Sequence, residues 1–243
     1  MSNAVLDNLK VKIFADGADI NGMLEMKKNP LIKGFTTNPT LMCKAGISDY
    51  EAFARDVLDQ ITEEPVSFEV FADEFDEMGA QALKIASWGK NVNVKIPVMN
   101  TKREFAGPLL ERLSAEGVVL NVTAIMTNEQ VKAIAEAIDP NTASIISVFA
   151  GRIADTGRDP VPLMNEANEI LKDLQPKADL LWASPRELLN IFQADETGCG
   201  IITVTNDVLK KLGTVGKDLD DFSAETVQMF YDDACAAGFK IDC

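Results

Sequence analysis

The most reactive side chain that the sequence offers is Lys95, in the middle of the otherwise apolar stretch VNVKIPV at residues 92–98. Lysine is among the residues least often fully buried. Side chains alternate between the two faces of a strand, so Val94 and Ile96 share one face and Lys95 lies on the other. If the apolar face packs on helices, the lysine amine points into the protein interior.

The same alternation predicts that polar residues of neighbouring strands face the same interior. In residues 118–125, for example, Leu120, Val122 and Ala124 are expected to face outward. Any one inward residue could be a buried ion-pair partner or part of a satisfied core network. Together they cost too much free energy to serve only as packing, which favours a functional site. The inward set comprises Asp16, Asn38, Glu69, Lys95, Asn121, Thr123 and Ser147.

These residue types suit imine chemistry. A lysine amine enclosed by apolar walls favours its neutral form, which attacks carbonyl groups to give a Schiff base. The chain contains no histidine, so carboxylates must carry the proton transfers. We expect Glu69, assisted by Thr123, to act at the imine, and Asp16 to take a proton from a substrate hydroxyl as a C–C bond breaks. Asn38 and Asn121 could hold further substrate hydroxyls.

Two arginines follow the late strands. Arg152 lies just past the sixth predicted strand, and Ser184 and Arg186 lie where the seventh is expected to turn into a helix. A helix N-terminus and two guanidinium groups suit a phosphate group. The alternative is that these arginines pair with acids such as Asp155 or Glu187.

Short apolar runs that alternate with helical patterns must position these residues. The predicted strands are 11–17, 34–38, 66–72, 92–98, 118–125, 144–151, 179–184 and 200–205. The predicted helices include 48–61, 73–90, 102–116, 127–138, 160–175 and 185–196. Eight such repeats favour a (β/α)8 barrel of the TIM type, whose active sites lie at the carboxyl ends of the strands.

An open doubly wound sheet is the competing fold, but no GxGxxG motif follows the first strand. We therefore predict one barrel domain over residues 1–243. Residues 222–240 are predicted to form an additional C-terminal helix, which could pack on its own barrel or join subunits in a homo-oligomer.

Composition excludes several functions. The formal net charge of −15 argues against nucleic acid and anionic membranes as partners, and no apolar run is long enough to span a membrane. The N-terminus lacks the apolar run of a signal peptide. Four scattered cysteines fit a reducing cytoplasm and have no metal-type spacing, and we expect no metal or other cofactor. The cysteines are Cys43, Cys199, Cys235 and Cys243.

Five motifs, GFTTNPTL, VKIPV, NVTAIMT, SVFAGRI and ASPRELL, together resemble the transaldolase family of class I aldolases. The match is with the compact bacterial transaldolases and fructose-6-phosphate aldolase-like proteins. The resemblance implies transfer of a dihydroxyacetone unit between sugar phosphates, without a cofactor, in the pentose phosphate pathway. One departure is Val148, where classical members often have proline.

The resemblance also assigns roles residue by residue. Lys95 matches the Schiff-base lysine, Asp16 the acid/base of cleavage, and Glu69 and Thr123 the pair that positions a catalytic water. The substrate-binding positions it implies are Thr36, Asn38, Ser67, Asn121, Ser147 and Phe149. The phosphate-binding positions it implies are Arg152, Ser184 and Arg186.

Two of these positions separate the branches of the family. The aldolase branch has glutamine in place of Glu69 and tyrosine in place of Phe149, so this chain sides with the transaldolases. The alternatives are an aldolase that releases free dihydroxyacetone and a non-catalytic sugar-phosphate binder.

Overall fold

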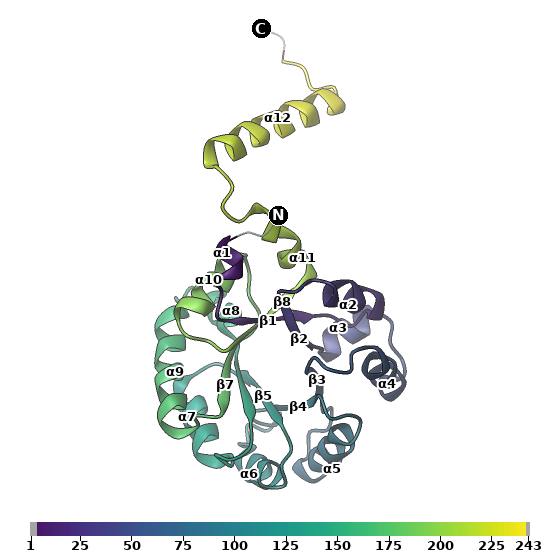
Figure 1. Ribbon diagram of the computed structural model, residues 1–243, viewed down its shortest axis with the longest axis vertical. Coiled ribbons are helices and arrows are strands. Elements are labelled where there is room, and N and C mark those ends of the chain that lie inside the picture. The colour runs from purple at the N-terminus through teal and green to yellow at the C-terminus, as the bar shows by residue number, and fades with distance from the viewer. Residues whose placement is uncertain (1–3, 242–243) are drawn as a thin grey trace.

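The computed structural model describes residues 4–241, and in it eight parallel strands form a closed barrel in chain order. Figure 1 shows the strands at the centre and helices around them. The strands are β1 (Lys12–Asp16), β2 (Ile32–Thr36), β3 (Val66–Glu69), β4 (Val92–Pro97), β5 (Leu120–Ile125), β6 (Ser144–Val148), β7 (Ala178–Trp182) and β8 (Ile201–Thr205). The predicted (β/α)8 fold is confirmed.

Six helices correspond to the predicted helical segments between strands. They are α4 (Tyr50–Gln60), α5 (Phe75–Ala86), α6 (Gly107–Ala115), α7 (Asn128–Ala137), α9 (Val161–Leu174) and α10 (Leu189–Glu196). Further short elements lie in the connections and near the N-terminus: α1 (Ala4–Asp7), α2 (Ile20–Lys27), α3 (Pro39–Lys44), α8 (Ala150–Ala154), α11 (Asn206–Leu209) and the 3-10 helix η1 (Lys210–Thr214).

The sequence pattern explains why the site occupies one end of the barrel. Outward apolar side chains such as Val94 and Ile96 are fully buried in the layer between strands and helices. Inside the barrel, Phe14 packs in a small apolar cluster with Ile145 near the start of β6, Ile201 at the start of β8, and Leu181 and Ala183 near the end of β7. A side chain at Gly34 would come 2.6 Å from the Phe14 ring, so glycine makes room for it. Apolar groups therefore fill the interior near the starts of β6 and β8, and the cavity with its polar residues lies at the other end of the barrel.

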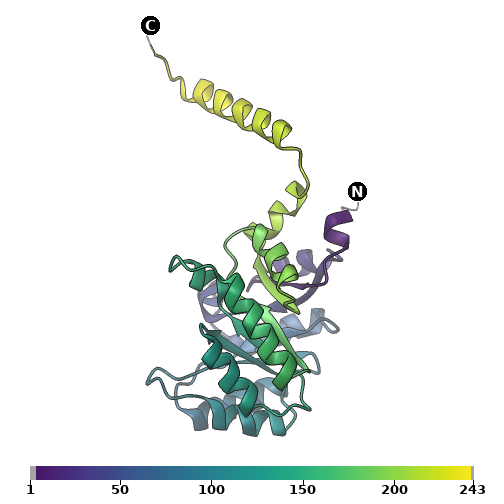
Figure 2. The ribbon, with the colours of Figure 1, turned by 90° about the vertical axis from the view of Figure 1, so that its left-hand side faces the viewer.

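The C-terminal helix α12 (Leu219–Ala237) is present and begins three residues earlier than predicted. Figures 1 and 2 show it extending away from the barrel. Asp218 caps its N-terminus, and Gly238 ends it in a left-handed conformation, φ 68°. None of its residues is buried. The helix therefore forms through local signals and not through packing on its own barrel.

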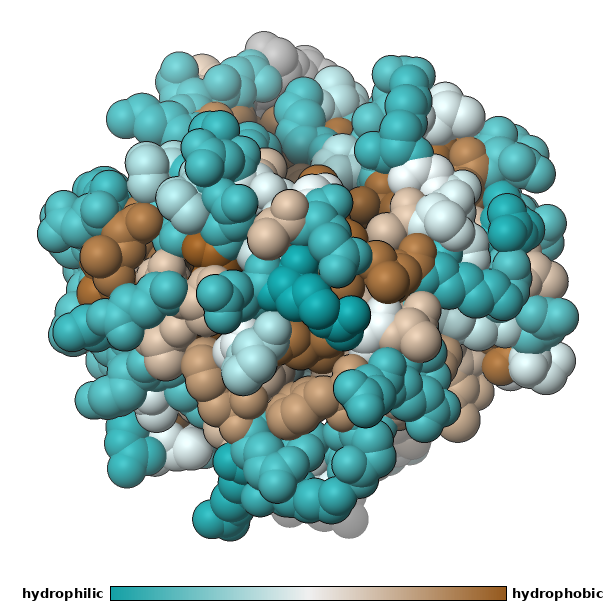
Figure 3. Space-filling view, turned by 90° about the horizontal axis from the view of Figure 1, so that it is seen from below, coloured by the Kyte–Doolittle hydropathy of each residue, from teal (hydrophilic) through white to brown (hydrophobic). Residues whose placement is uncertain are grey.

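Figure 3 shows that the barrel face opposite α12 is mostly hydrophilic, with small apolar patches. Among the residues that the structure describes, no helix combines the length and apolar character needed to cross a membrane. Cys43, Cys199 and Cys235 are free thiols, and Cys243 lies outside the described range.

Candidate active site

Lys95 and Glu69 face each other inside the barrel. They are register partners on β4 and β3, and Lys95 Nζ lies 3.0 Å from Glu69 Oε2. The amine also donates a hydrogen bond of 2.9 Å to the carbonyl of Thr37. The Lys95 side chain is 10% exposed and that of Glu69 is 19% exposed. The neutral amine expected from the sequence stays a prediction.

Asp16 lies at the end of β1 among hydrogen-bond donors. Thr36 Oγ1 donates to Asp16 Oδ1 at 2.7 Å, and Asn38 Nδ2 donates to Asp16 Oδ2 at 3.3 Å. The Thr203 hydroxyl contacts the Thr36 hydroxyl, whose single proton is directed at Asp16. Burial raises the pKa of Asp16 above its usual value, and the charge of Lys95 and the two hydrogen bonds oppose that rise. The arrangement suits a carboxyl group that exchanges a proton.

Asn38 is oriented by its helix. Its side-chain oxygen accepts a hydrogen bond of 3.0 Å from the Leu41 backbone and caps the N-terminus of α3. The amide nitrogen is thereby left to face Asp16. Pro39 at the first helical position strengthens this helix start. The TTNPTL motif thus fixes which end of the Asn38 amide meets the carboxylate.

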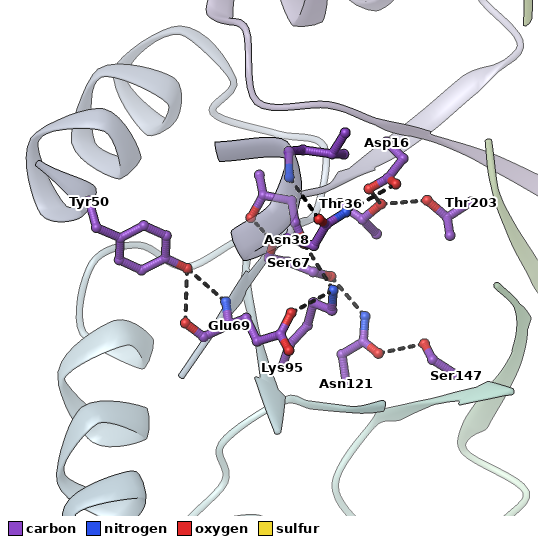
Figure 4. Close-up of polar contacts among 12 residues, drawn as sticks. Asp16, Thr36, Asn38, Tyr50, Ser67, Glu69, Lys95, Asn121, Ser147 and Thr203 are labelled. Atoms are coloured by element: carbon purple, nitrogen blue, oxygen red, sulfur yellow. Dashed lines mark hydrogen bonds and ion pairs between the residues drawn. The ribbon is translucent and has the colours of Figure 1, made fainter. Parts of the chain in front are cut away.

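A second polar chain crosses the interior from β3 to β6. Asn121 Nδ2 donates to Ser67 Oγ at 3.1 Å, and Ser147 Oγ donates to Asn121 Oδ1 at 2.6 Å (Figure 4). All three residues are at most 3% exposed. Each buried polar group therefore has a partner, which holds Asn121 in one orientation at the cavity wall.

The end of β5 departs from the predicted strand geometry. Ala124 has φ 63°, and the register with β6 shifts between Val122 and Ile125. Ala124 is exposed and lines the cavity, so the prediction that it faces the helices is wrong. A bulge adds a residue to one strand and re-aims its neighbours. Thr123, 3% exposed, lies within this irregular stretch and lines the same cavity.

A cavity of about 590 Å³ collects the predicted residues. Ser67 does not line it but supports Asn121 from behind. Sequence reasoning missed Lys44 and Thr203, which also line the cavity. Thr203 alternates with the apolar Ile202 and Val204, so the parity argument could have found it. The predicted residues that line the cavity are Asp16, Thr36, Asn38, Glu69, Lys95, Asn121, Thr123, Ser147, Phe149, Arg152, Ser184 and Arg186.

The arginines sit at the cavity's rim and are more exposed. Arg186 Nε donates to Asp155 Oδ1 at 2.9 Å, a second bond joins Nη2 to Oδ2, and Nη1 donates to Ser184 Oγ at 3.1 Å. This ion pair lowers the pKa of Asp155 and raises that of Arg186. The guanidinium of Arg152 lies 5.2 Å from the centre of the Phe149 ring. The sequence left open that Arg186 pairs with an acid such as Asp155, and the structure contains this ion pair.

The helix that follows β7 begins later than predicted. α10 starts at Leu189, and the backbone N–H groups of Arg186 and Glu187 donate to Asn190 Oδ1 at 2.7 and 3.1 Å. The predicted helix start at residue 185, with free N–H groups for a phosphate, is therefore wrong. An anion at this rim would be held by side chains.

Close backbone contact fixes the two arginine segments together. A Cβ at Gly151 would lie 1.5 Å from the Ser184 carbonyl oxygen, and Ser184 itself has φ 63°. Only glycine permits this approach. The segment that carries Arg152 and the one that carries Arg186 thus meet at the same edge of the cavity.

Fold and geometry define a (β/α)8-barrel protein with a lysine–carboxylate site at the carboxyl ends of its strands. A sequence profile described as Transaldolase/Fructose-6-phosphate aldolase matches residues 13–242. The chain belongs to this transaldolase/fructose-6-phosphate aldolase family.

Curated relatives agree with this assignment. A "Probable transaldolase" of Dehalococcoides mccartyi is 37% identical over 202 residues, which cover 83% of this chain and 90% of the relative. A "Probable transaldolase" of Methanococcus maripaludis is 32% identical over 223 residues, covering 89% and 99%. Among solved structures, 3-hexulose-6-phosphate synthase from Salmonella typhimurium matches with a TM-score of 0.58 at 12% identity, covering 85% of this chain and 94% of that one. That likeness concerns the fold alone.

Proposed function

We propose that the protein is a transaldolase that moves a dihydroxyacetone unit from a ketose phosphate to an aldose phosphate through a Schiff base on Lys95. Sedoheptulose 7-phosphate and fructose 6-phosphate are the donors we propose. The observation that carries the proposal is the buried amine of Lys95, 3.0 Å from the Glu69 carboxylate, in a cavity that Asp16 also lines.

In the proposed first half-reaction, Lys95 Nζ attacks the ketone carbon of the donor. Glu69 delivers two protons in turn to the former ketone oxygen, the one it shares with Lys95 and one from the attacking nitrogen, so that water departs and a protonated imine forms. Thr123 and Glu69 line the cavity where that water would lie. Asp16 takes the proton of the C4 hydroxyl, the C3–C4 bond breaks to release an aldose phosphate, and the electron pair of that bond moves into the protonated imine to give a neutral enamine.

The second half-reaction reverses these steps with a new aldehyde. The enamine carbon attacks the acceptor's carbonyl carbon, and the protonated Asp16 returns its proton to the new hydroxyl. Water then adds to the imine, with Glu69 as base, and releases the product ketose. The raised pKa of Asp16 suits a group that must be both base and acid in one cycle.

The arginine rim supports a phosphorylated substrate. Arg152, Ser184 and Arg186 line the outer part of the same cavity as Lys95. Guanidinium groups bind phosphate through paired, charge-assisted hydrogen bonds. The family resemblance at Glu69 and Phe149 supports transfer over release of free dihydroxyacetone. We further propose that the enzyme works in the cytoplasm, in the pentose phosphate pathway, without a cofactor.

Borohydride reduction tests the enzyme proposal. With sedoheptulose 7-phosphate present, reduction of the imine should add the mass of the reduced donor fragment to Lys95, located by peptide mass spectrometry. A mass unchanged at Lys95 would contradict every lysine-based reaction and leave a sugar-phosphate binder.

Turnover of the donor with and without an acceptor distinguishes the two enzymes. We expect fructose 6-phosphate to be consumed rapidly only when erythrose 4-phosphate is present, because the enamine on Lys95 is released only after it has reacted with an acceptor aldehyde. Equal consumption without the acceptor, with free dihydroxyacetone as product, would identify an aldolase instead.

We also propose that α12 joins this barrel to a second copy. Val227, Phe230 and Tyr231 lie at helical spacing and are 62–65% exposed. Exposed apolar faces of this kind mark interaction sites. Analytical ultracentrifugation of the full chain should give an oligomer that Phe230→Asp dissociates; a wild-type monomer would refute the proposal.

A further inference from the structure

The hydroxyl of Tyr50 on α4 has no part in the chemistry described above, yet it contacts the backbone of Glu69. Glu69 N–H donates to Tyr50 Oη at 2.7 Å, and Tyr50 Oη donates to the Glu69 carbonyl at 3.0 Å (Figure 4). One phenol therefore satisfies both backbone groups of the residue that faces Lys95. A hydroxyl has one proton and two lone pairs, so it can play both parts at once.

The barrel ladder explains why Glu69 needs such a partner. β2 pairs with β3 only at Phe35–Val66 and Thr36–Ser67, and Thr37 N–H then donates to the Ser67 carbonyl at 3.1 Å. In a continued parallel ladder, the next bond would run from Glu69 N–H to the Thr37 carbonyl. The chain instead turns into α3, and that bond is replaced.

The Thr37 carbonyl is thereby left for the lysine. It accepts a hydrogen bond of 2.9 Å from Lys95 Nζ. Tyr50 occupies the N–H group that would otherwise compete for this carbonyl. The Tyr50 hydroxyl thus takes the place of the Thr37 carbonyl as the hydrogen-bond partner of the Glu69 N–H group. The Thr37 carbonyl remains available to accept a hydrogen bond from the Lys95 amine.

The surroundings of Tyr50 hold its ring in place. Its ring packs edge-on against Phe68, Phe71 and Trp88, with centroids 4.4–6.2 Å apart. Burial raises the pKa of Tyr50, so the phenol keeps its proton at neutral pH and remains a donor. Rigid packing and a permanent proton are what a positioning group requires.

Resting on the proposed function, we infer that Tyr50 is a positioning residue for catalysis: its hydroxyl fixes the backbone of Glu69 and frees the Thr37 carbonyl to orient Lys95. It does not touch substrate. Losing it would leave the N–H of Glu69 without its partner and able to draw the Thr37 carbonyl away from the amine, which moves both reacting groups.

Tyr50→Phe tests the inference because it keeps the ring and removes only the hydroxyl. We expect kcat to fall on the order of tenfold or more, since small misplacements of reacting groups are costly. KM for phosphorylated donors should stay within about twofold, since the arginine rim is untouched. The single-turnover rate of borohydride-trappable adduct formation on Lys95 should fall with kcat.

Two controls separate positioning from general damage. Ile134→Ala removes a fully buried side chain on α7 that neither packs on Tyr50 nor lines the cavity, so it should lower thermal stability while kcat stays near the wild-type value. Tyr231→Phe removes the hydroxyl of the sequence's other tyrosine, on α12, but keeps the ring that we place in the proposed contact between copies, so it should change neither quantity.

The outcomes are distinguishable from those of the proposed function. If wild type forms no adduct and turns over no donor, the enzyme proposal fails first. If wild type is active and Tyr50→Phe matches it in kcat and adduct rate, the inference about Tyr50 is overturned. A kcat loss that Ile134→Ala reproduces in proportion to its loss of stability would overturn it as well. Should Tyr50→Phe not fold, 3-fluorotyrosine incorporation, which weakens the hydroxyl's accepting power, should still slow the wild-type enzyme.

Discussion

The cavity has an enclosed interior around Lys95 and an open rim around Arg186, and the two ends differ in how far water reaches their charged and polar groups. Interior polar groups such as Lys95, Asp16 and Asn121 have fixed partners and little contact with water. The Arg186 side chain is 44% exposed and its partner Asp155 is 53% exposed. Low-dielectric surroundings strengthen electrostatic interactions, and water weakens them.

This difference predicts which kinetic quantity each end controls. Interior groups should govern the chemical step because their positions cannot adjust. Rim groups should govern capture of the charged substrate because they meet it in solvent. A rim substitution that mainly lowers kcat would contradict this division of roles, and so would an interior substitution that mainly raises KM.

The largest effect is expected from Lys95→Ala. Removing the amine removes the atom that we propose bonds to the donor, so turnover and borohydride-trapped adduct should both vanish. Circular dichroism should still report a folded barrel. Lys12→Ala, which removes an exposed lysine at the opposite end of β1, is the matched control and should retain full activity.

Asp16→Asn should cost roughly 10²–10⁴-fold in kcat, the range typical of a general acid–base group. It should also change the pH dependence of stability. Burial raises the folded-state pKa of Asp16 above 3.8, so folded protein retains a proton that the unfolded chain loses. Wild-type stability therefore falls as pH rises through that window.

Asparagine cannot ionise, so the variant does not lose the stability that wild type loses when the buried Asp16 carboxyl group is deprotonated. Relative to wild type, Asp16→Asn should gain stability at neutral pH, and the gain should shrink as pH approaches 3.8. Thermal unfolding at several pH values measures it. A difference in unfolding free energy that does not vary with pH would show that the carboxyl group is not perturbed as inferred.

Alternation along strands predicted most of the interior, because a closed barrel gives each strand only two faces. Lys95, Glu69 and Asp16 fall where parity places them. Ala124 does not, because its left-handed conformation ends the alternation on which the prediction depended. Counting alternate residues along a strand cannot predict where a bulge interrupts the alternation.

The rim was harder to predict because it depends on loop geometry. The start of α10 was placed at residue 185, since Ser-Pro resembles a helix start, but the Asn190 side chain instead folds the segment before Leu189. The role of Tyr50 was missed for another reason. It faces a gap in a strand ladder, and where a ladder stops is a property of the folded chain.

Arg186→Ala should raise KM for phosphorylated donors by roughly tenfold, less than a fully buried charged hydrogen bond would give, since water screens the rim. The kcat value should change little. Arg158→Ala is a matched control, because that arginine is exposed and does not line the central cavity. An equal rise in KM for non-phosphorylated substrates would show that Arg186 does not bind the phosphate group.

The smallest effect is expected from Asp155→Asn. In wild type the Asp155 carboxylate occupies two Arg186 donors, so an incoming phosphate must compete with it. Asparagine removes that negative charge, and KM for phosphorylated donors should fall by roughly twofold at low ionic strength. The gain should disappear at high salt, because counterions screen the exposed pair. If KM rises instead, Asp155 serves to hold Arg186 for the phosphate, and the rim is more rigidly organised than the comparison with the interior implies.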